Sequence, residues 1–233
     1  MSDLNVSVIV PCFNEEKTIE QVLLRILNQK DIVKEIIVID DNSTDNSRQK
    51  IEKMSNLNPI IQYFFKDINE GKGSALIKGF SLSKGDIVLV QDADLEYDPE
   101  EYKKLIKPFT ESNADVVYGS RFLGGDMVRL HFFWHYLANK ILTFICNIVT
   151  NLNMSDMETG YKLIKKKHLD KINLKEKSFG IEPELTVKLA KKNLVFYEVP
   201  ISYKGRTYQE GKKIGFKDAV VAMYCILKYR FFD

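Results

Sequence analysis

Three acidic residues at alternate positions, Asp92, Asp94 and Glu96, are the side chains in this sequence best suited to chemistry. Carboxylate oxygens are hard ligands that suit Mg²⁺ or Mn²⁺, and without a cation their mutual repulsion is costly. They follow an apolar run over residues 87–90, which is typical of a strand buried on both faces of a parallel sheet. Ligands of open α/β sheets bind at the carboxyl ends of the strands, so we expect a metal site there that attracts a diphosphate.

Two other interpretations of this acidic segment are a calcium-binding loop and a solvated turn. An EF-hand loop that starts at Asp92 requires an invariant glycine where this sequence has Tyr97, and a bidentate glutamate where it has Lys103. The sequence therefore excludes that calcium loop. A solvated turn stays open when the segment is considered alone, because alternating carboxylates are a short and permissive pattern.

Length and composition favour a single soluble α/β domain. The chain has 233 residues, of which 45% are hydrophobic and 28% charged. Cys12, Cys146 and Cys225 lie in apolar contexts, so we expect buried thiols and a cytoplasmic location. We expect neither a signal peptide nor a membrane span, since the longest apolar stretch, residues 130–149, contains histidine, asparagine and lysine. No nucleic-acid partner is expected.

The two parts of the chain differ in charge. Residues 1–159 carry 17 basic and 24 acidic side chains, a net −7, whereas residues 160–233 carry 17 and 8, a net +9. The basic part favours an anionic partner, either a phosphate or a membrane surface. The closing segment over residues 216–232 is apolar and basic. It either completes the core, lies in a membrane interface, or contacts a membrane-bound partner protein. We expect a peripheral protein at the inner face of the membrane.

Hydrophobic periodicity predicts alternating strands and helices, and hence a mostly parallel sheet with right-handed crossovers. The predicted strands span residues 6–13, 35–39, 60–65, 87–90, 115–122 and 195–206, with one short strand after residues 158–161. The predicted helices span residues 15–28, 45–54, 71–80, 99–109, 132–149, 181–192 and 216–232.

The usual nucleotide-binding motifs are absent. The loop over residues 11–15 lacks G-x-G-x-x-G, so dinucleotide binding in the usual mode is not expected. The segment GKGS over residues 71–74 is not a P-loop, because Lys66 stands where the first glycine is required and Gly73 replaces the hydroxyl residue. Its glycines either let a helix N-terminus approach a phosphate or sugar, or allow tight packing on the sheet.

Six segments in order, VSVIVPCFNEE, EIIVIDDNSTD, GKGSAL, DADLEYDP, GSRF and GRTYQEGKK, resemble those of family 2 glycosyltransferases with the GT-A fold. The resemblance is strongest to the dolichol-phosphate mannose synthase-like branch, which glycosylates polyprenyl phosphates. It implies one α/β glycosyltransferase domain over residues 1–233, with a mostly parallel twisted sheet flanked by helices. Residues 1–122 would be the nucleotide-sugar-binding half. Residues 123–233 would be the acceptor-side half, with a basic loop and a C-terminal amphipathic helix.

The resemblance also implies roles for individual residues. Asp92, Asp94 and Glu96 would bind Mg²⁺ or Mn²⁺, and Asp94, Arg121 and Asp156 would be catalytic. The donor, GDP-mannose or a UDP-hexose, would contact the ends of the first two strands, the D-x-D element and the basic side chains. This donor set is Pro11, Phe13, Glu15, Val38, Asp40, Asp92, Ala93, Asp94, Arg121, Arg206 and Lys212. A divalent cation with arginine and lysine stabilises the charge that develops on the leaving nucleoside diphosphate.

The acceptor determines whether a general base is needed. A polyprenyl phosphate is already ionised near neutral pH, because its second pKa is about 6. A saccharide hydroxyl, the alternative in cell-surface polysaccharide synthesis, requires a carboxylate such as Asp156 or Glu158. Glu182 and Glu184 are interpreted as charges at a helix N-terminus and are left out of the catalytic set.

Two further functional classes remain as rivals. A non-catalytic nucleotide-sugar-binding subunit has little need for a full set of charge-stabilising side chains. A sugar-1-phosphate nucleotidyltransferase is disfavoured, because the glycine-rich loop with arginine and lysine expected after its first strand is absent.

Overall fold

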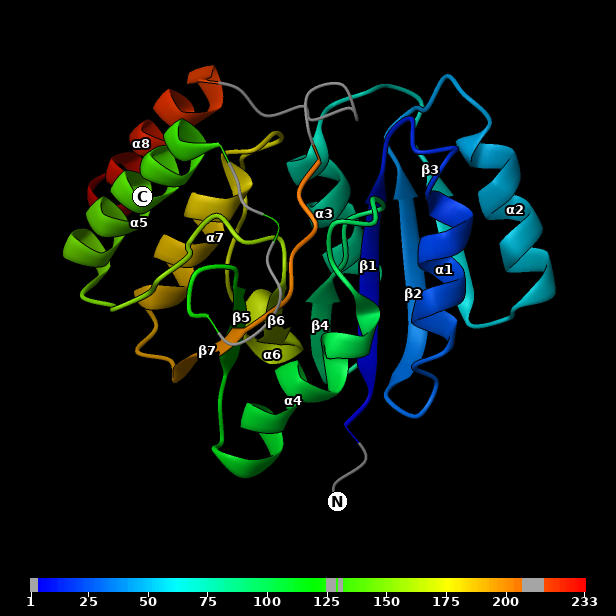
Figure 1. Ribbon diagram of the computed structural model, residues 1–233, viewed down its shortest axis with the longest axis horizontal. Coiled ribbons are helices and arrows are strands. Elements are labelled where there is room, and N and C mark those ends of the chain that lie inside the picture. Colours follow the sequence, from blue (N-terminus) through cyan, green and yellow to red (C-terminus); the bar gives the residue numbers. More distant parts are fainter. Residues whose placement is uncertain (1–3, 125–128, 130–131, 207–215) are drawn as a thin grey trace.

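Strands and helices alternate along the chain and form a seven-stranded sheet with helices on both faces (Figure 1) in the described part of the protein. The computed structural model describes residues 4–124, 129, 132–206 and 216–233. The strands are β1 (Val6–Cys12), β2 (Val33–Asp40), β3 (Ile61–Phe65), β4 (Ile87–Val90), β5 (Val116–Ser120), β6 (Lys162–Lys165) and β7 (Phe196–Pro200). The helices are α1 (Ile19–Leu27), α2 (Ser47–Leu57), α3 (Lys72–Leu82), the 3₁₀ helix η1 (Pro99–Glu101), α4 (Tyr102–Glu111), α5 (Phe133–Thr150), α6 (Lys166–Leu169), α7 (Ile181–Ala190) and α8 (Phe216–Phe231).

The strand order is β3-β2-β1-β4-β6-β5-β7, and every pair except those made by β6 is parallel. This confirms the prediction of a mostly parallel sheet. Because β6 runs antiparallel between β4 and β5, its first residues lie at the edge where those two strands end. The loop before β6, residues 155–161, is thereby brought to the carboxyl edge of the sheet, where ligands of this fold class bind.

Two apolar cores lie on the two faces of the sheet. Val8 and Val10 pack with α1, α2 and α4 in one core, whereas Ile9 between them packs with α3, α5, α7 and α8 in the other. Successive side chains of a strand point to opposite faces, so a strand that is apolar at every position must be covered on both. The continuous apolar runs of the sequence follow from this arrangement.

Two element predictions need correction. The first helix begins at Ile19 and not at residue 15, because residues 16–18 form a turn. The strand expected over residues 195–206 ends at Pro200. The chain then turns toward Glu96, whose main-chain oxygen accepts from Lys204 N at 2.9 Å and whose Oε1 accepts from Arg206 N at 2.7 Å. The short helix α6 was not predicted.

Candidate active site

A cavity of about 620 Å³ lies at the carboxyl edge of the sheet. Glu15 follows β1, Asp92 and Asp94 follow β4, and Arg121 follows β5, so segments far apart in sequence line the same space. The predicted site residues found in its wall are Pro11, Phe13, Glu15, Asp92, Ala93, Asp94, Glu96, Arg121 and Arg206. The prediction that the strand ends form one site agrees with this lining.

Basic side chains neutralise the acidic segment after β4. Asp92 Oδ1 lies 2.7 Å from Lys72 Nζ, and Asp94 Oδ2 lies 2.7 Å from Arg206 Nη2. Glu96 accepts from the hydroxyl of Tyr203 at 2.6 Å and from the main-chain nitrogen of Arg206. Burial, together with the charges of Asp92 and Glu96, raises the pKa of Asp94 to about 8 although Arg206 opposes the shift. Asp94 therefore carries its negative charge less readily than an ordinary carboxyl group.

The three carboxylates do not form a ready-made metal site. In the ranges that the structure describes, no group of three or more His, Cys, Asp or Glu side chains is arranged to hold a metal ion. Asp92 and Asp94 nevertheless fit a divalent cation, because Mg²⁺ is usually held by one or two carboxylates together with substrate phosphates. The raised pKa of Asp94 is the sign of a carboxyl group that a nearby cation would stabilise.

Lys72 is a cavity residue that sequence reasoning missed. Its Nζ lies between Asp92 and Glu182, 3.2 Å from Glu182 Oε1, at the start of α3. Burial disfavours its charge, but these two carboxylates outweigh burial and raise the pKa of Lys72. The flanking glycines allow this position, because a Cβ on Gly73 would lie 2.2 Å from the carbonyl oxygen of Glu176. Tight packing against that loop therefore explains the glycines of the GKGS segment.

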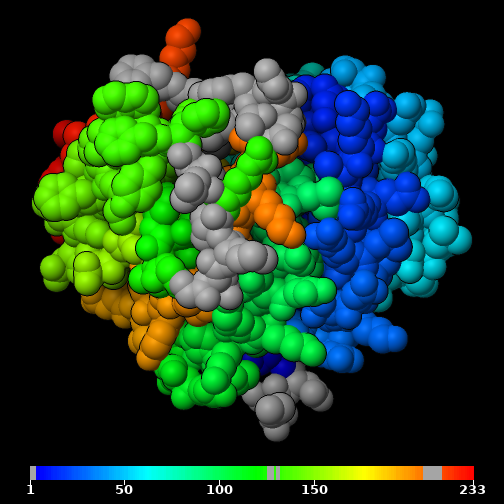
Figure 2. All heavy atoms as spheres, in the orientation of Figure 1, coloured from blue at the N-terminus to red at the C-terminus, as the bar shows by residue number. Residues whose placement is uncertain are grey.

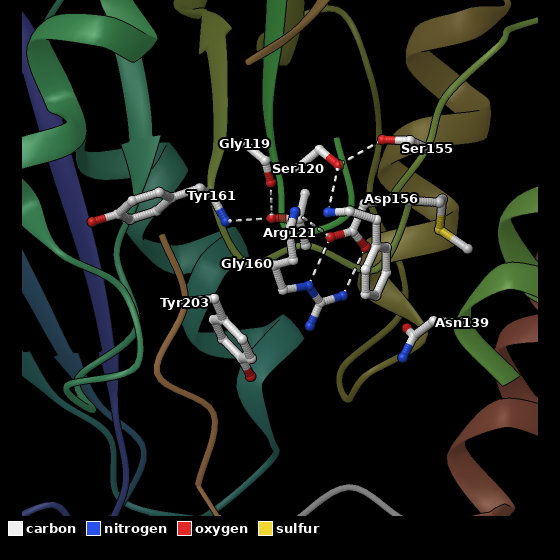
Figure 3. Close-up of polar contacts among 12 residues, drawn as sticks. Gly119, Ser120, Arg121, Asn139, Ser155, Asp156, Gly160, Tyr161 and Tyr203 are labelled. Atoms are coloured by element: carbon white, nitrogen blue, oxygen red, sulfur yellow. Dashed lines mark hydrogen bonds and ion pairs between the residues drawn. The ribbon is translucent and has the colours of Figure 1, made fainter. Parts of the chain in front are cut away.

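Arg121 is held by Asp156 in a two-pronged ion pair (Figure 3). Nε donates to Oδ2 and Nη2 donates to Oδ1, both at 2.7 Å, and the main-chain nitrogen of Arg121 also donates to Oδ2. Asp156 is fully buried behind the arginine and does not line the cavity. Burial opposes the charge of Arg121, yet Asp156 raises the pKa of the guanidinium well above its usual range. This geometry gives Asp156 a positioning role.

Glu158 and Glu182 also line the cavity. Glu182 belongs to α7 and pairs with the buried Lys162 at 2.5 Å, so this side chain, left out on sequence grounds, is part of the site wall. Burial and the charge of Glu182 raise the pKa of Glu158 to about 7, against the effect of Lys162. The Oε1 atom of Glu158 is buried without a hydrogen-bond partner in the described part of the chain. Glu184 instead accepts from main-chain nitrogens, among them that of Lys175.

Two predicted donor contacts do not reach the cavity. Val38 is fully buried within β2. Asp40 Oδ1 accepts from Arg48 Nε at 2.6 Å and from Ser43 N, outside the cavity wall. The next residue, Asp41, lines the cavity instead. Successive side chains at the end of β2 point to opposite sides, which explains why Asp41 and not Asp40 lines the cavity. The sequence alone does not reveal which of the two aspartates does so.

The remaining basic residues of the donor set lie in the segment after β7. Arg206 contacts three carboxylates, because Nη1 lies 3.2 Å from Glu15, Nη2 2.7 Å from Asp94 and Nε 3.4 Å from Glu96. It thus joins the ends of β1 and β4 across the cavity. Lys212 lies outside the described residues, so its predicted contact stays a prediction.

Two helices with exposed apolar side chains close the far side of the cavity. Trp134, Tyr136 and Leu142 of α5 line it, and so do Ala219 and Ala222 of α8. The two helices pack against each other (Figure 1). Among the described helices, none combines the length and apolarity that crossing a bilayer requires. The exposed apolar residues of this face are Phe132, Phe133, Trp134, Tyr136, Ile141, Phe144, Ile148, Val220, Val221, Tyr224, Leu227, Phe231 and Phe232.

Comparison with known sequences shows the family. The family model described as Glycosyl transferase family 2 matches residues 7–172. A dolichol-phosphate mannosyltransferase of Pyrococcus furiosus is 30% identical over 215 residues, which are 91% of this chain and 60% of that protein. The chain therefore spans less than two thirds of the length of that relative. An uncharacterized protein of Methanocaldococcus jannaschii is 30% identical over 212 residues, 83% of this chain and 86% of that protein.

Comparison with solved structures shows the fold. Glucosyl-3-phosphoglycerate synthase of Mycobacterium tuberculosis, in complex with Mn²⁺, UDP and phosphoglyceric acid, matches with a TM-score of 0.76 at 18% identity. The match covers 99% of this chain and 80% of that one. The same enzyme with Mg²⁺ and UDP matches with a TM-score of 0.73 at 20% identity, over 97% of this chain and 79% of that one. The expected GT-A fold is confirmed, and the chain belongs to glycosyl transferase family 2, with a similarity to dolichol-phosphate mannosyltransferases.

Proposed function

We propose that this glycosyltransferase moves a sugar from GDP-mannose or a UDP-hexose to a polyprenyl phosphate, with inversion at the anomeric carbon. One observation carries the proposal. A single cavity joins a cluster of carboxylates and arginines to a wall built by two helices with exposed apolar side chains. The charged part suits a diphosphate and the apolar part suits an isoprenoid chain. The similarity to a dolichol-phosphate mannosyltransferase supports this class of acceptor.

The donor would lie across the strand ends, with its nucleoside at Pro11, Phe13 and Glu15 and its diphosphate beside Asp92 and Asp94. Mg²⁺ or Mn²⁺ held by Asp92 and Asp94 would stabilise the negative charge that develops on the leaving diphosphate. The guanidinium of Arg206, 2.7 Å from Asp94, is close enough to contribute to the same stabilisation. In this proposal Lys212 adds charge from the basic loop.

A lipid phosphate is a nucleophile that needs no strong base near neutral pH. The arrangement around Asp156 agrees with such an acceptor, because both of its oxygens hold Arg121 and none is left to take a proton. Glu158, the other carboxylate considered as a base, lines the cavity. Arg121 lines the cavity with its charge fixed in place. We therefore assign Arg121 to phosphate binding and Asp156 to its orientation.

The site of action would be the inner membrane surface. Figure 2 shows the side chains of α5 (green, at the left) on the outside of the molecule, beside α8 (red). Trp134 is 75% exposed and Phe144 64% exposed, which leaves a large apolar face in water unless a partner covers it. A bilayer interface is the environment that suits such helices, and the net +9 of residues 160–233 favours anionic headgroups.

The proposal is tested by incubating the pure protein with GDP-mannose, UDP-glucose and related donors, Mn²⁺, and a short polyprenyl phosphate. We expect release of the nucleoside diphosphate with one donor only when the polyprenyl phosphate is present. NMR of the product then reports the anomeric configuration, which should be opposite to that of the donor. Retention of configuration would overturn the inverting part of the proposal, and equal release with a free saccharide would overturn the acceptor.

A further inference from the structure

We propose that Glu158 accepts a hydrogen bond from a hydroxyl group of the transferred sugar, an inference that rests on the proposed use of a nucleotide-sugar donor. Its side chain lines the cavity. Its Oε1 atom is sealed from solvent and has no hydrogen-bond partner among the residues that the structure describes. Buried polar atoms of folded proteins are almost always paired, so an unpaired one on a cavity-lining side chain points to a group that arrives with the ligand.

The other acidic groups of the same wall already have partners. Asp92 pairs with Lys72, Asp94 with Arg206, and Glu182 with Lys162 at 2.5 Å. Asp41 Oδ1 lies 2.5 Å from Lys66 Nζ, and Glu15 contacts Arg206. Within the described part of the chain, Glu158 is thus the cavity-lining acid that has a buried oxygen left without a donor.

The loop that carries Glu158 is fixed on both sides of it. Thr159 Oγ1 donates to the main-chain oxygen of Gly119. Four main-chain nitrogens of the loop are also held by side chains: Ser155 by Glu198 at 2.8 Å, Asp156 by Glu198 at 3.1 Å, Met157 by Thr143 at 3.1 Å and Gly160 by Tyr97 at 2.8 Å. Such anchoring keeps Glu158 in place before the ligand arrives, which is what a specific contact requires.

The chemistry of the ligand follows from what Oε1 lacks. A carboxylate oxygen needs a hydrogen-bond donor, and a hydroxyl group supplies one. A diphosphate and an ionised lipid phosphate present only acceptor oxygens near neutral pH, so neither satisfies it. The nucleoside also carries donors, but in the proposed function it lies at Pro11, Phe13 and Glu15. The hydroxyls of the transferred sugar are therefore the donors that fit this site.

The position of the loop indicates that the hydroxyl group belongs to the transferred sugar of the donor. Gly160 packs so closely on the strand end that a Cβ there would lie 2.6 Å from Asp92 Oδ2. Glu158 is two residues from this contact and lines the same cavity as Asp92 and Asp94, which form the proposed diphosphate site. The sugar bonded to that diphosphate is the hydroxyl-bearing group that must lie there. A hydroxyl of a saccharide acceptor is the other source, with Glu158 then acting as a general base.

The test compares binding of nucleotide-sugars and of nucleoside diphosphates, without any acceptor. Calorimetry with Mn²⁺ measures UDP-glucose against UDP and GDP-mannose against GDP, on wild type, Glu158→Met and Glu158→Gln. Methionine keeps the volume and removes the acceptor oxygen, whereas glutamine keeps an oxygen that can accept. Glu111→Gln, which removes an exposed charge on α4, is the matched control.

Wild type should bind one nucleotide-sugar more tightly than its diphosphate. Glu158→Met should weaken the nucleotide-sugar roughly 10- to 100-fold and leave the diphosphate unchanged, with Glu158→Gln in between and Glu111→Gln like wild type. Deoxy analogues of the sugar identify the hydroxyl, because the right one lowers wild-type affinity to that of Glu158→Met. A thermal melt of Glu158→Met at or above the wild-type temperature excludes a merely structural role.

The outcomes separate this inference from the proposed function. If Glu158→Met binds the nucleotide-sugar as tightly as wild type, the inference is overturned while the proposed function stands. If donor binding is unchanged and turnover with an acceptor loses its acidic pH limb, Glu158 is a general base and the inference is equally overturned. If wild type binds none of the four compounds, the proposed function fails, and the inference fails with it.

Discussion

Arg206 and Lys72 occupy the carboxylates that we propose for a divalent cation. Each basic group contacts more than one acid, Arg206 at Glu15, Asp94 and Glu96, and Lys72 at Asp92 and Glu182. Binding of a cation at Asp92 and Asp94 would weaken these contacts and free both side chains for the diphosphate. Substituting single carboxylates tests this exchange.

Asp94→Asn should remove most of the gain in nucleoside diphosphate affinity that Mn²⁺ provides, because the amide no longer supplies an anionic ligand. We expect roughly a tenfold loss or more. Calorimetry of UDP and GDP with and without Mn²⁺ measures it. Asp31→Asn, an exposed aspartate before β2, is the control. Equal affinity in all four combinations of metal and variant at position 94 would contradict the metal role.

Glu158 should make the stability of the protein pH-dependent. Burial raises its pKa from the ordinary 4.5 to about 7 in the folded state, with a contribution from Glu182 and against Lys162 and Arg121. A carboxyl group with a raised folded-state pKa contributes stability that is present below the ordinary value and lost as the pH rises through 7.

Glu158→Gln removes that dependence. Relative to wild type, the variant should gain about 3 kcal/mol in free energy of unfolding between mildly acidic and mildly alkaline pH. Urea unfolding of both proteins across this range provides the measurement. Parallel curves of wild type and variant against pH would show that Glu158 titrates normally.

Some of the site residues could be predicted from their spacing in the sequence alone. The alternate carboxylates at 92, 94 and 96 follow a buried run, and such a pattern indicates a strand end rich in charge. Lys72 and Glu182 were not predicted, because a lysine between glycines and a glutamate in a first helical turn each have a structural explanation. Only tertiary packing brings them to Asp92.

The start of α3 packs closely against the loop over residues 176–178. A Cβ at Gly73 would lie 2.2 Å from Glu176 O and 2.8 Å from Lys177 C, which are main-chain atoms that cannot move cheaply. Replacing glycine by alanine in a helix gains about 1 kcal/mol of propensity, whereas overpacking costs about 1–3 kcal/mol. Because the clash involves main-chain atoms, we expect the overpacking cost to outweigh the gain in helix propensity.

Gly73→Ala should therefore lower the free energy of unfolding by about 1–2 kcal/mol and weaken donor binding by shifting Lys72. Urea unfolding and calorimetry measure the two effects. Ser81→Ala, on the exposed side of the same helix, should change stability by less than about 0.5 kcal/mol. An unchanged or higher stability of Gly73→Ala would show that the loop at 176–178 yields easily.

The strand β6 shows why the topology was only partly predictable. Its four residues were predicted as a short strand after a turn, but nothing local indicates an antiparallel place between β4 and β5. That place is set by long-range pairing. It also decides that the loop with Asp156 and Glu158 reaches the active site. The alternating strands β1 to β4 were predictable because each is a continuous apolar run.

At the scale of the whole molecule, charge and apolar surface are unevenly distributed. Exposed apolar residues gather on α5 and α8 at one end of the molecule, with α2 at the other (Figure 1). The sequence already indicated the basic half and the aromatic start of α5. It did not indicate that the two helices pack side by side, since that contact joins segments far apart in the chain.

The double variant Trp134→Ser/Phe144→Ser should lose binding to anionic vesicles by roughly tenfold or more, because two apolar side chains no longer enter the interface. Co-sedimentation at low salt measures it, and wild-type binding should weaken at high salt through screening. Leu57→Ser/Ile68→Ser, at two other exposed apolar positions, is the matched control. If the wild-type protein does not co-sediment with anionic vesicles at low salt, the membrane role is refuted.

The central claim is that the cavity transfers a sugar to a lipid phosphate. The most direct test measures nucleoside diphosphate release with the best donor and Mn²⁺, comparing a short polyprenyl phosphate with the polyprenol of equal length, which lacks the phosphate. We expect release with the polyprenyl phosphate only, a mannosyl or hexosyl lipid phosphate as product, and strongly reduced release by Arg121→Ala. Equal release with the polyprenol, or full activity of Arg121→Ala, would contradict it.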